Sequence, residues 1–204
     1  MTWIVADISV SVDGFVTGPD AGPGNGLGTG GEALHTWAFS DDAEDRRIVQ
    51  EATARSGAVI LGRRLFDVVD GPAGWNDEVG YGAGEVGRPA FVVVTSVVPD
   101  SVRLTDLDWT FVTTGLPDAV AAARTRAEAA SAEKGQDLDV VVMGGGATVG
   151  SAVAAGLVDV LSLHLAPVVL GAGTPLFTGG AARTLVQRSV IPTSTATHLT
   201  YDVV

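Results

Sequence analysis

The 204-residue chain contains no cysteine, which excludes disulfides, thiolate zinc sites and a cysteine nucleophile. Histidine is also scarce, and His35, His164 and His198 lie far apart without forming a His-Glu-x-x-His motif. We therefore predict no metal site, and we interpret each histidine as structural. A chain without disulfides fits a reducing compartment, so we predict a cytoplasmic protein.

Positive charge is in short supply, because Lys and Arg total 12 against 24 Asp and Glu, for a formal net charge of -12 at pH 7. Such a chain repels nucleic acid and anionic membranes, so we predict neither as a partner. Lys134 is the only lysine and follows no glycine run, which excludes a P-loop. Asp7 and Asp13 interrupt the amino-terminal apolar stretch, so we expect neither a signal sequence nor a membrane span.

Hydrophobic residues make up 46% of the chain, which is enough for one large core. We predict a single domain over residues 1–204. Apolar and β-branched runs typical of buried strands occur at 2–12, 58–61, 90–95, 109–113 and 138–143.

Helical segments separate these strands. The segment 40–55 opens on polar residues that can cap a helix, and 117–134 has a proline in its first turn and Gly135 after its end. Alternating strands and helices predict an α/β fold, with a mostly parallel sheet covered by helices on both faces. The strand-like segments 184–191 and 195–203 leave no room for a helix between them, and so predict a carboxyl-terminal antiparallel hairpin.

Three consecutive glycines, Gly144, Gly145 and Gly146, separate the strand-like run 138–143 from a helix-compatible stretch at 147–157. Without Cβ atoms, this turn lets a ligand approach the main chain, and the N–H groups at a helix start favour a phosphate. A tight turn that binds nothing is the alternative.

Arg63 and Arg64 directly follow another predicted strand, at the start of a short helix. Cations are unfavourable at a helix start unless an anion is bound there, and a nucleotide phosphate would supply that anion. Arginines that simply face solvent are the alternative. Thr95 and Ser96 end a further strand, and the carboxyl ends of parallel strands meet at one ligand crevice.

Two glycine-rich segments form the longest predicted loops. The loop 18–31 follows the first strand and is either a mobile loop beside a site or a passive surface loop. The loop 71–87 contains Trp75 and Tyr81, and it either forms the wall of a pocket or covers the sheet.

A Rossmann domain does not fit, because its glycine turn belongs to the first strand and helix, whereas here the turn comes late in the chain. The pattern Pro-x-x-x-Gly-x-Gly-x-Pro-Leu-Phe from Pro167 is more distinctive. Together with the motifs at 11–16, 62–64, 144–146 and 197–201, it resembles the dihydrofolate reductase-like superfamily. The resemblance is strongest to the branch related to the carboxyl-terminal reductase domain of riboflavin biosynthesis.

The resemblance implies an NADPH-dependent oxidoreductase that transfers hydride to a C=N or C=O bond of a small heterocyclic substrate. Such an enzyme would be similar to 5-amino-6-(5-phosphoribosylamino)uracil reductase or to dihydrofolate reductase. The resemblance also places the arginine pair near the adenosine phosphate, with Arg63 as the leading contact, and the glycine turn on the pyrophosphate. The implied cofactor residues are Val16, Gly62, Arg63, Arg64, Leu65, Thr95, Ser96, Gly144, Gly145, Gly146, Ala147 and Thr148.

For the substrate, we predict a wall formed by Trp37 and Trp75, and polar anchors at Asp41, Asp42 and Asp45. Trp37 is equally well interpreted as a core residue.

Some positions depart from the family pattern. Met143 stands where riboflavin-pathway reductases carry Glu, and Thr53 stands where they carry an arginine for the substrate phosphate. An ungapped alignment places Arg46 where dihydrofolate reductases have a carboxylate. A nucleotide-binding protein without turnover is therefore the alternative function.

We also predict a homodimer, from the resemblance and from the apolar stretch 158–170. An internal strand is the alternative interpretation of this stretch.

Overall fold

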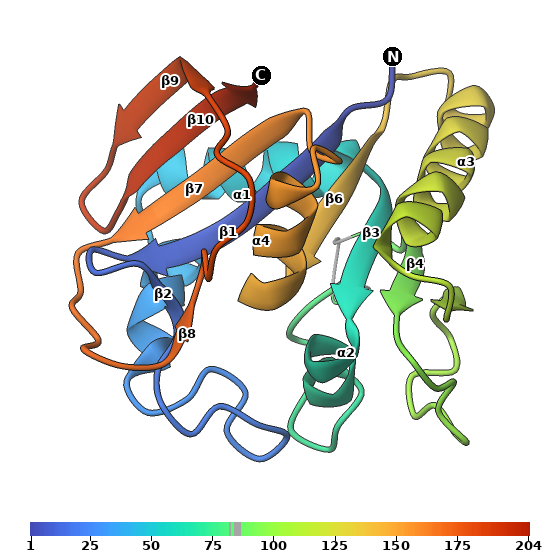
Figure 1. Ribbon diagram of the computed structural model, residues 1–204, viewed down its shortest axis with the longest axis horizontal. Helices are drawn as coiled ribbons and strands as arrows, with labels where there is room; N and C mark the ends of the chain where they lie inside the picture. The colour runs from blue at the N-terminus through green and yellow to red at the C-terminus, as the bar shows by residue number, and fades with distance from the viewer. Residues whose placement is uncertain (82, 84–86) are drawn as a thin grey trace.

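The computed structural model describes residues 1–81, 83 and 87–204. Its main feature is an eight-stranded sheet with the order β5-β4-β3-β6-β1-β7-β10-β9 (Figure 1). Part of the predicted loop 71–87 lies outside the described residues. The strands of the sheet are β1 (Ile4–Ser11), β3 (Ser56–Gly62), β4 (Ala90–Val94), β5 (Trp109–Val112), β6 (Asp139–Gly144), β7 (Val160–Ala166), β9 (Leu185–Pro192) and β10 (Thr197–Val203).

Strands β1, β3, β4, β5, β6 and β7 are parallel to one another, whereas β10 is antiparallel to both β7 and β9. The central strands are rich in Val and Ile, and every residue of β3 is buried, as expected for a sheet covered on both faces. The predicted parallel sheet and carboxyl-terminal hairpin are therefore confirmed.

Helices cover both faces of the sheet, as predicted, with α4 in front of it and α1 behind it in Figure 1. Helices α3 and α4 share one apolar core with β1, β6 and β7, while α2 packs over β3 and β4 in a second core. The helices are η1 (Gly31–Phe39), α1 (Ala43–Arg55), α2 (Arg63–Val69), α3 (Leu116–Lys134) and α4 (Gly146–Ala154).

Local signals explain the start of α1 and the end of α3. Helix α1 begins after Asp42, whose carboxylate accepts a hydrogen bond from the Glu44 N–H at 2.9 Å. Helix α3 ends at Gly135, whose φ of 65° lies in the left-handed region that glycine tolerates. His35 lies in the 3₁₀ helix η1, a helix that the sequence analysis did not predict. A short 3₁₀ helix lacks the 3.6-residue period that reveals an α-helix.

A second, two-stranded sheet pairs β2 (Phe15–Thr17) with β8 (Thr174–Pro175). It joins the segment after β1 to the glycine-containing segment after β7, beside the carboxyl ends of the parallel strands. Among the helices of the described part of the chain, none combines the length and hydropathy that a membrane span requires.

Strand β7 lies inside the sheet, between β1 and β10. The stretch 158–170, which motivated the homodimer prediction, is therefore mainly an internal strand. The edge strands are β5 and β9, and in β9 the apolar residues Leu185, Val186 and Val190 are 39%, 51% and 45% exposed.

Candidate cofactor and substrate site

The carboxyl ends of β3, β4 and β6 lie side by side, because these parallel strands are neighbours in the sheet. The start of α2 follows β3, and the start of α4 follows β6. The two turns are in close contact, since a Cβ at Gly62 would collide with the Thr148 hydroxyl. The predicted phosphate-binding segments are thus adjacent in space.

The glycine turn between β6 and α4 leaves room for a ligand. A Cβ added to Gly145 would meet no atom within 4 Å. Gly145 is the N-cap of α4, and the first N–H groups of a helix have no partner within it. Gly146 is different, because a Cβ there would collide with Val16. Val16 of β2 therefore packs directly against the glycine turn.

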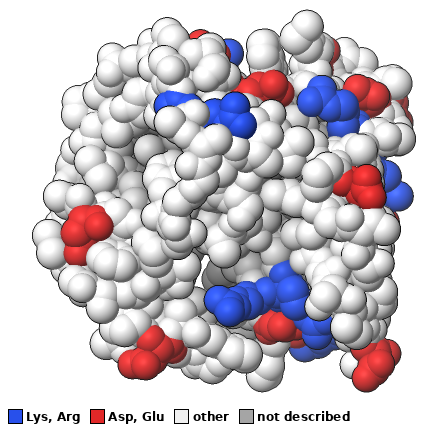
Figure 2. All heavy atoms as spheres, in the orientation of Figure 1, with Lys and Arg blue, Asp and Glu red and all other residues white. Residues whose placement is uncertain are grey.

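The two neighbouring arginines have different surroundings. The Arg63 guanidinium donates to the Asp67 carboxylate and to the Val97 carbonyl, each at 2.7 Å, and to the Thr95 hydroxyl at 3.4 Å. It therefore braces the turn that follows β4. Arg64 is exposed and makes no hydrogen bond or ion pair with the described residues. Figure 2 shows basic side chains gathered over the part of this face where Figure 1 places α2.

The remaining predicted cofactor residues lie around these two turns. The Leu65 side chain is 3.8 Å from the position that a Cβ on Gly144 would take. Ser96 is exposed directly after the buried Thr95, and Ala147 is exposed in the first turn of α4. The structure thus brings the predicted cofactor residues together at one edge of the sheet.

The predicted substrate residues are less closely grouped. The buried Trp37 indole donates to the Ser9 hydroxyl at 2.9 Å and stacks on His164 of β7, with 4.0 Å between ring centroids. Trp75 packs against Tyr81 and against Phe91 of β4. Four strand spacings separate β4 from β7, or roughly 19 Å. The structure therefore does not bring Trp37 and Trp75 together in one wall.

The three predicted aspartates also have different environments. Asp41 is exposed and pairs with Arg46 at 3.0 Å. Asp42 caps α1 and accepts a hydrogen bond from the Ser194 hydroxyl at 3.0 Å. The carboxylate that α1 directs inward is Asp45, which is fully buried. Arg46, which the ungapped alignment placed at the position of the carboxylate, has an exposed side chain instead.

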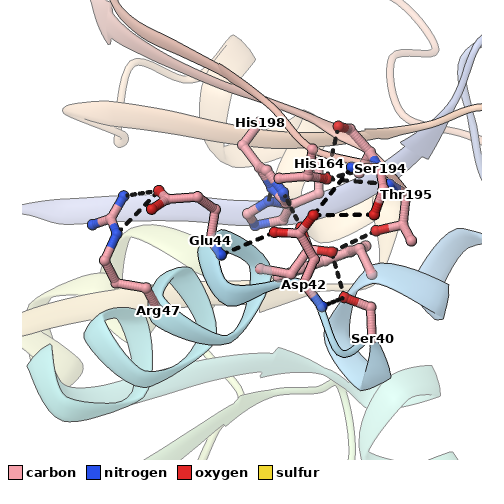
Figure 3. Close-up of polar contacts among 12 residues, drawn as sticks. Ser40, Asp42, Glu44, Arg47, His164, Ser194, Thr195 and His198 are labelled. Atoms are coloured by element: carbon pink, nitrogen blue, oxygen red, sulfur yellow. Dashed lines mark hydrogen bonds and ion pairs between the residues drawn. The ribbon is translucent and has the colours of Figure 1, made fainter.

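Asp45 ends a chain of four hydrogen-bonded titratable side chains from four elements. Asp7 of β1 is 3.0 Å from His164 Nε2, the Nδ1 atoms of His164 and His198 are 2.7 Å apart, and His198 Nε2 is 2.8 Å from Asp45. The second Asp45 oxygen accepts from the hydroxyls of Ser40 and Thr195, each at 2.5 Å. Figure 3 shows Ser40, Thr195, His164 and His198 around this site.

These contacts determine the protonation of Asp45. Burial alone would raise its pKa, but the hydrogen bonds from Ser40, Thr195 and His198 outweigh burial and hold the pKa at about 2. Burial lowers the pKa of His198. Asp45 is thus ionised at neutral pH, beside a ring that burial keeps neutral.

A cavity of about 380 Å³ lies between α1 and the sheet. Its sides include apolar residues of β1, β6 and β7 and charged residues of α1, and Asp7, His164 and His198 all line it. Within the described residues, no group of three His, Cys, Asp or Glu side chains has the arrangement of a metal site.

Comparison with known protein families identifies the family of this chain. The family model of the RibD C-terminal domain matches residues 2–199. The chain belongs to the RibD C-terminal domain family. No curated protein sequence matches the chain.

Solved structures share the fold of this RibD C-terminal domain. A putative riboflavin biosynthesis protein from Shewanella sp. PV-4 is 17% identical with a TM-score of 0.68, and the match covers 99% of each chain. Acinetobacter baumannii RibD is 18% identical with a TM-score of 0.65, and the match covers 100% of this chain and 58% of that one. Dihydrofolate reductase from Enterococcus faecalis is 14% identical, with a TM-score of 0.53 over 98% of this chain and 96% of that one.

Sequence reasoning missed the roles of Asp7, His164 and His198 in this RibD-type domain. One local signal was present, because Asp7 is a charged residue within a run that otherwise reads as a buried strand. The contacts among the four side chains arise only in the folded sheet, from residues up to 157 positions apart.

Proposed function

We propose that this domain is an NADPH-dependent oxidoreductase that transfers hydride to a C=N or C=O bond of a small heterocyclic substrate. The observation that carries the proposal is the open glycine turn at Gly145, in contact with the segment that presents Arg64. The RibD family and the reductases among the structural neighbours support it, and the Enterococcus dihydrofolate reductase structure is a complex with NADP(H).

The cofactor would lie across the carboxyl ends of β6 and β3. The N–H groups of Gly146 and Ala147 suit the pyrophosphate, because a helix start favours anions and residue 145 leaves space above the turn. Arg64 offers the 2′-phosphate of NADPH a guanidinium that pairs with none of the described residues, while Arg63 holds Thr95 and the following turn in place. When bound there, NADPH would supply a hydride from its dihydronicotinamide ring.

We propose a substrate that differs from those of the two best-known branches. Both oxygens of Asp45 already accept hydrogen bonds from protein groups, and the Thr53 hydroxyl donates to the Val49 carbonyl at 2.8 Å. The carboxylate that dihydrofolate would need is therefore already held by protein donors, and position 53 carries no arginine for a substrate phosphate. We expect kcat/KM below about 10⁴ M⁻¹s⁻¹ for dihydrofolate and for the phosphorylated riboflavin precursor, measured by steady-state kinetics.

We further propose that the domain forms a homodimer through the exposed edge strand β9. Unpaired strand edges are templates for pairing with another chain. The apolar side chains of Leu185, Val186 and Val190 are exposed there.

The test combines calorimetric titration of NADPH with measurement of NADPH oxidation. The oxidation panel contains 7,8-dihydropterin, dihydrofolate, the phosphorylated aminouracil and diacetyl. Binding together with oxidation by any member would support the reductase. Tight binding without oxidation across the panel would support a nucleotide-binding protein without turnover, and no NADPH binding would contradict both.

A further inference from the structure

The hydrogen bonds among Asp7, His164, His198 and Asp45 determine how many protons these four side chains share. It contains three hydrogen bonds, and each requires one hydrogen. An ionised carboxylate only accepts, and a neutral imidazole has one donor and one acceptor nitrogen. If both carboxylates are ionised, both Nε2 atoms must donate, and the contact between the Nδ1 atoms then requires an additional proton on one ring. If all three hydrogen bonds are made, the four side chains together carry three protons and a net charge of −1.

The surroundings determine where the third proton lies. Asp45 is ionised because three donors hold its carboxylate, and His198 is neutral because it is buried. His198 therefore donates through Nε2 and accepts at Nδ1, which makes His164 Nδ1 the donor of the central bond. The third proton must then lie between His164 Nε2 and Asp7.

Asp7 is the solvent-accessible end of this hydrogen-bonded network. The Asp7 side chain is 25% exposed, whereas those of His164, His198 and Asp45 are 2%, 5% and 0% exposed. One Asp7 oxygen faces His164, and the other accepts no hydrogen bond from the described residues. Asp7 also lines the cavity between α1 and the sheet. The transferable proton is thus at the accessible end of a buried chain.

Aromatic and charged residues surround the four hydrogen-bonded side chains. Trp37 stacks on the His164 ring and fixes its orientation. Burial lowers the pKa of His35 in η1, whose Nδ1 is buried without a partner among the described residues, and burial raises the pKa of Tyr81 to about 12. The other charged groups that line the cavity are Arg47, Glu51 and Arg55 of α1, Asp139 of β6 and Arg188 of β9.

We propose that the Asp7–His164 pair is the acid that protonates the substrate during its reduction. This inference rests on the proposed NADPH-dependent function. The acceptor carbon of the C=N or C=O bond gains the hydride from NADPH, and the π electron pair moves to the nitrogen or oxygen. That atom then takes the proton from Asp7, whose O–H bond breaks. A proton from solvent restores the chain, because the contact between Asp7 and His164 Nε2 otherwise lacks its hydrogen.

Within this proposal Asp7 is the catalytic residue, and His198 and Asp45 are positioning residues. They fix the direction of the three hydrogen bonds and hold the proton at the Asp7 end. A general acid acts only while it carries a proton, so the rate of reduction should depend on pH. Asn in place of Asp7 keeps the shape of the carboxylate but cannot deliver a proton.

The first test needs no substrate. Long-range nitrogen–proton NMR spectra of the histidines at neutral pH should show a proton on Nδ1 of His164, and on Nε2 but not Nδ1 of His198. A doubly protonated His198, or two Nδ1 atoms without a proton, would overturn the proton assignment.

The second test measures single-turnover NADPH oxidation with 7,8-dihydropterin and with diacetyl. Asp7→Asn should lower the rate at least about 100-fold and abolish its pH dependence, while the Kd for NADPH stays within about twofold. His198→Gln should shift the pH profile. Glu128→Gln, which removes an exposed carboxylate of α3, should leave the rate and the profile unchanged.

The outcomes separate this inference from the proposed function. An unchanged rate and pH profile in Asp7→Asn, with active wild-type protein, would refute the acid role alone. If the wild-type protein oxidises NADPH with neither probe, the acid role fails together with the reductase. In that case the NMR spectra still decide where the protons lie.

Discussion

Replacement of Arg64 by alanine should weaken NADPH binding while leaving NADH binding nearly unchanged. Arg64 is exposed at the start of α2 and makes no hydrogen bond or ion pair with the described residues. Its removal should therefore cost little folding energy. NADPH carries a phosphate where NADH carries a hydroxyl, so NADPH alone gains a charge-assisted contact with this guanidinium.

The expected magnitude follows from the number of contacts that are lost. Loss of a hydrogen bond to a charged group costs about 1.5 to 3 kcal/mol, which corresponds to an increase in Kd of roughly one to two decades. Arg64→Lys keeps the charge but loses the planar fork, so its affinity should be intermediate. Arg63→Ala should lower the melting temperature, because Arg63 bonds Asp67 and the Val97 carbonyl. It should weaken NADPH binding only through the loss of this support for the turn after β4.

The assay is calorimetric titration of NADPH and NADH into wild type and each variant. Arg88→Ala is the matched control, because Arg88 is an exposed arginine before β4, at the opposite end of that strand from Thr95. It should leave both affinities unchanged. Equal weakening of NADPH and NADH by Arg64→Ala, or no weakening of NADPH, would refute the assignment of Arg64 to the 2′-phosphate.

Three further predictions address other parts of the structure. Gly145→Val should weaken NADPH and NADH alike in the same titration, because its side chain would fill the space above the glycine turn. Asp45 has a pKa of about 2 in the folded state against 3.8 as its ordinary value, so its contribution of roughly 2 kcal/mol is complete above that value and is lost as the pH falls toward 2. In urea unfolding, the stability difference between wild type and Asp45→Asn should therefore shrink over this range, and a constant difference would contradict the assignment. Val186→Asp should convert a dimer to monomer in sedimentation equilibrium at tens of micromolar (roughly, well above the Kd of a stable dimer), and a monomeric wild type would remove the dimer proposal.

Features that depend on local sequence could be predicted without the structure. The buried strands follow from runs such as 138–143, where branched apolar residues suit a sheet covered on both faces. The glycine turn at 144–146 and the arginines at 63–64 were also recognisable, because each directly follows a strand. Parallel strands bring their carboxyl ends to one edge, which explains why these segments are neighbours.

Features that depend on tertiary packing could not be predicted in this way. Each residue turns an α-helix by about 100°, so a shift of one position decides whether Asp45 or Arg46 of α1 faces the sheet. The contact between His164 and His198 depends on the register of β7 with β10, in which the two residues are directly opposite. Neither the rotation of a helix nor the register of two strands is recorded in a local pattern.

The most direct test of the central claim is an NMR titration of the labelled protein with NADPH, followed through its backbone amide signals. We expect the largest shifts at 144–148, at 62–65 and at 95–96, where the structure places the glycine turn and the arginine pair. Saturable shifts that are largest in these three segments would confirm cofactor binding at this edge of the sheet. Shifts that are largest elsewhere, or no shifts at millimolar NADPH (about the weakest affinity of a functional cofactor site), would contradict the account.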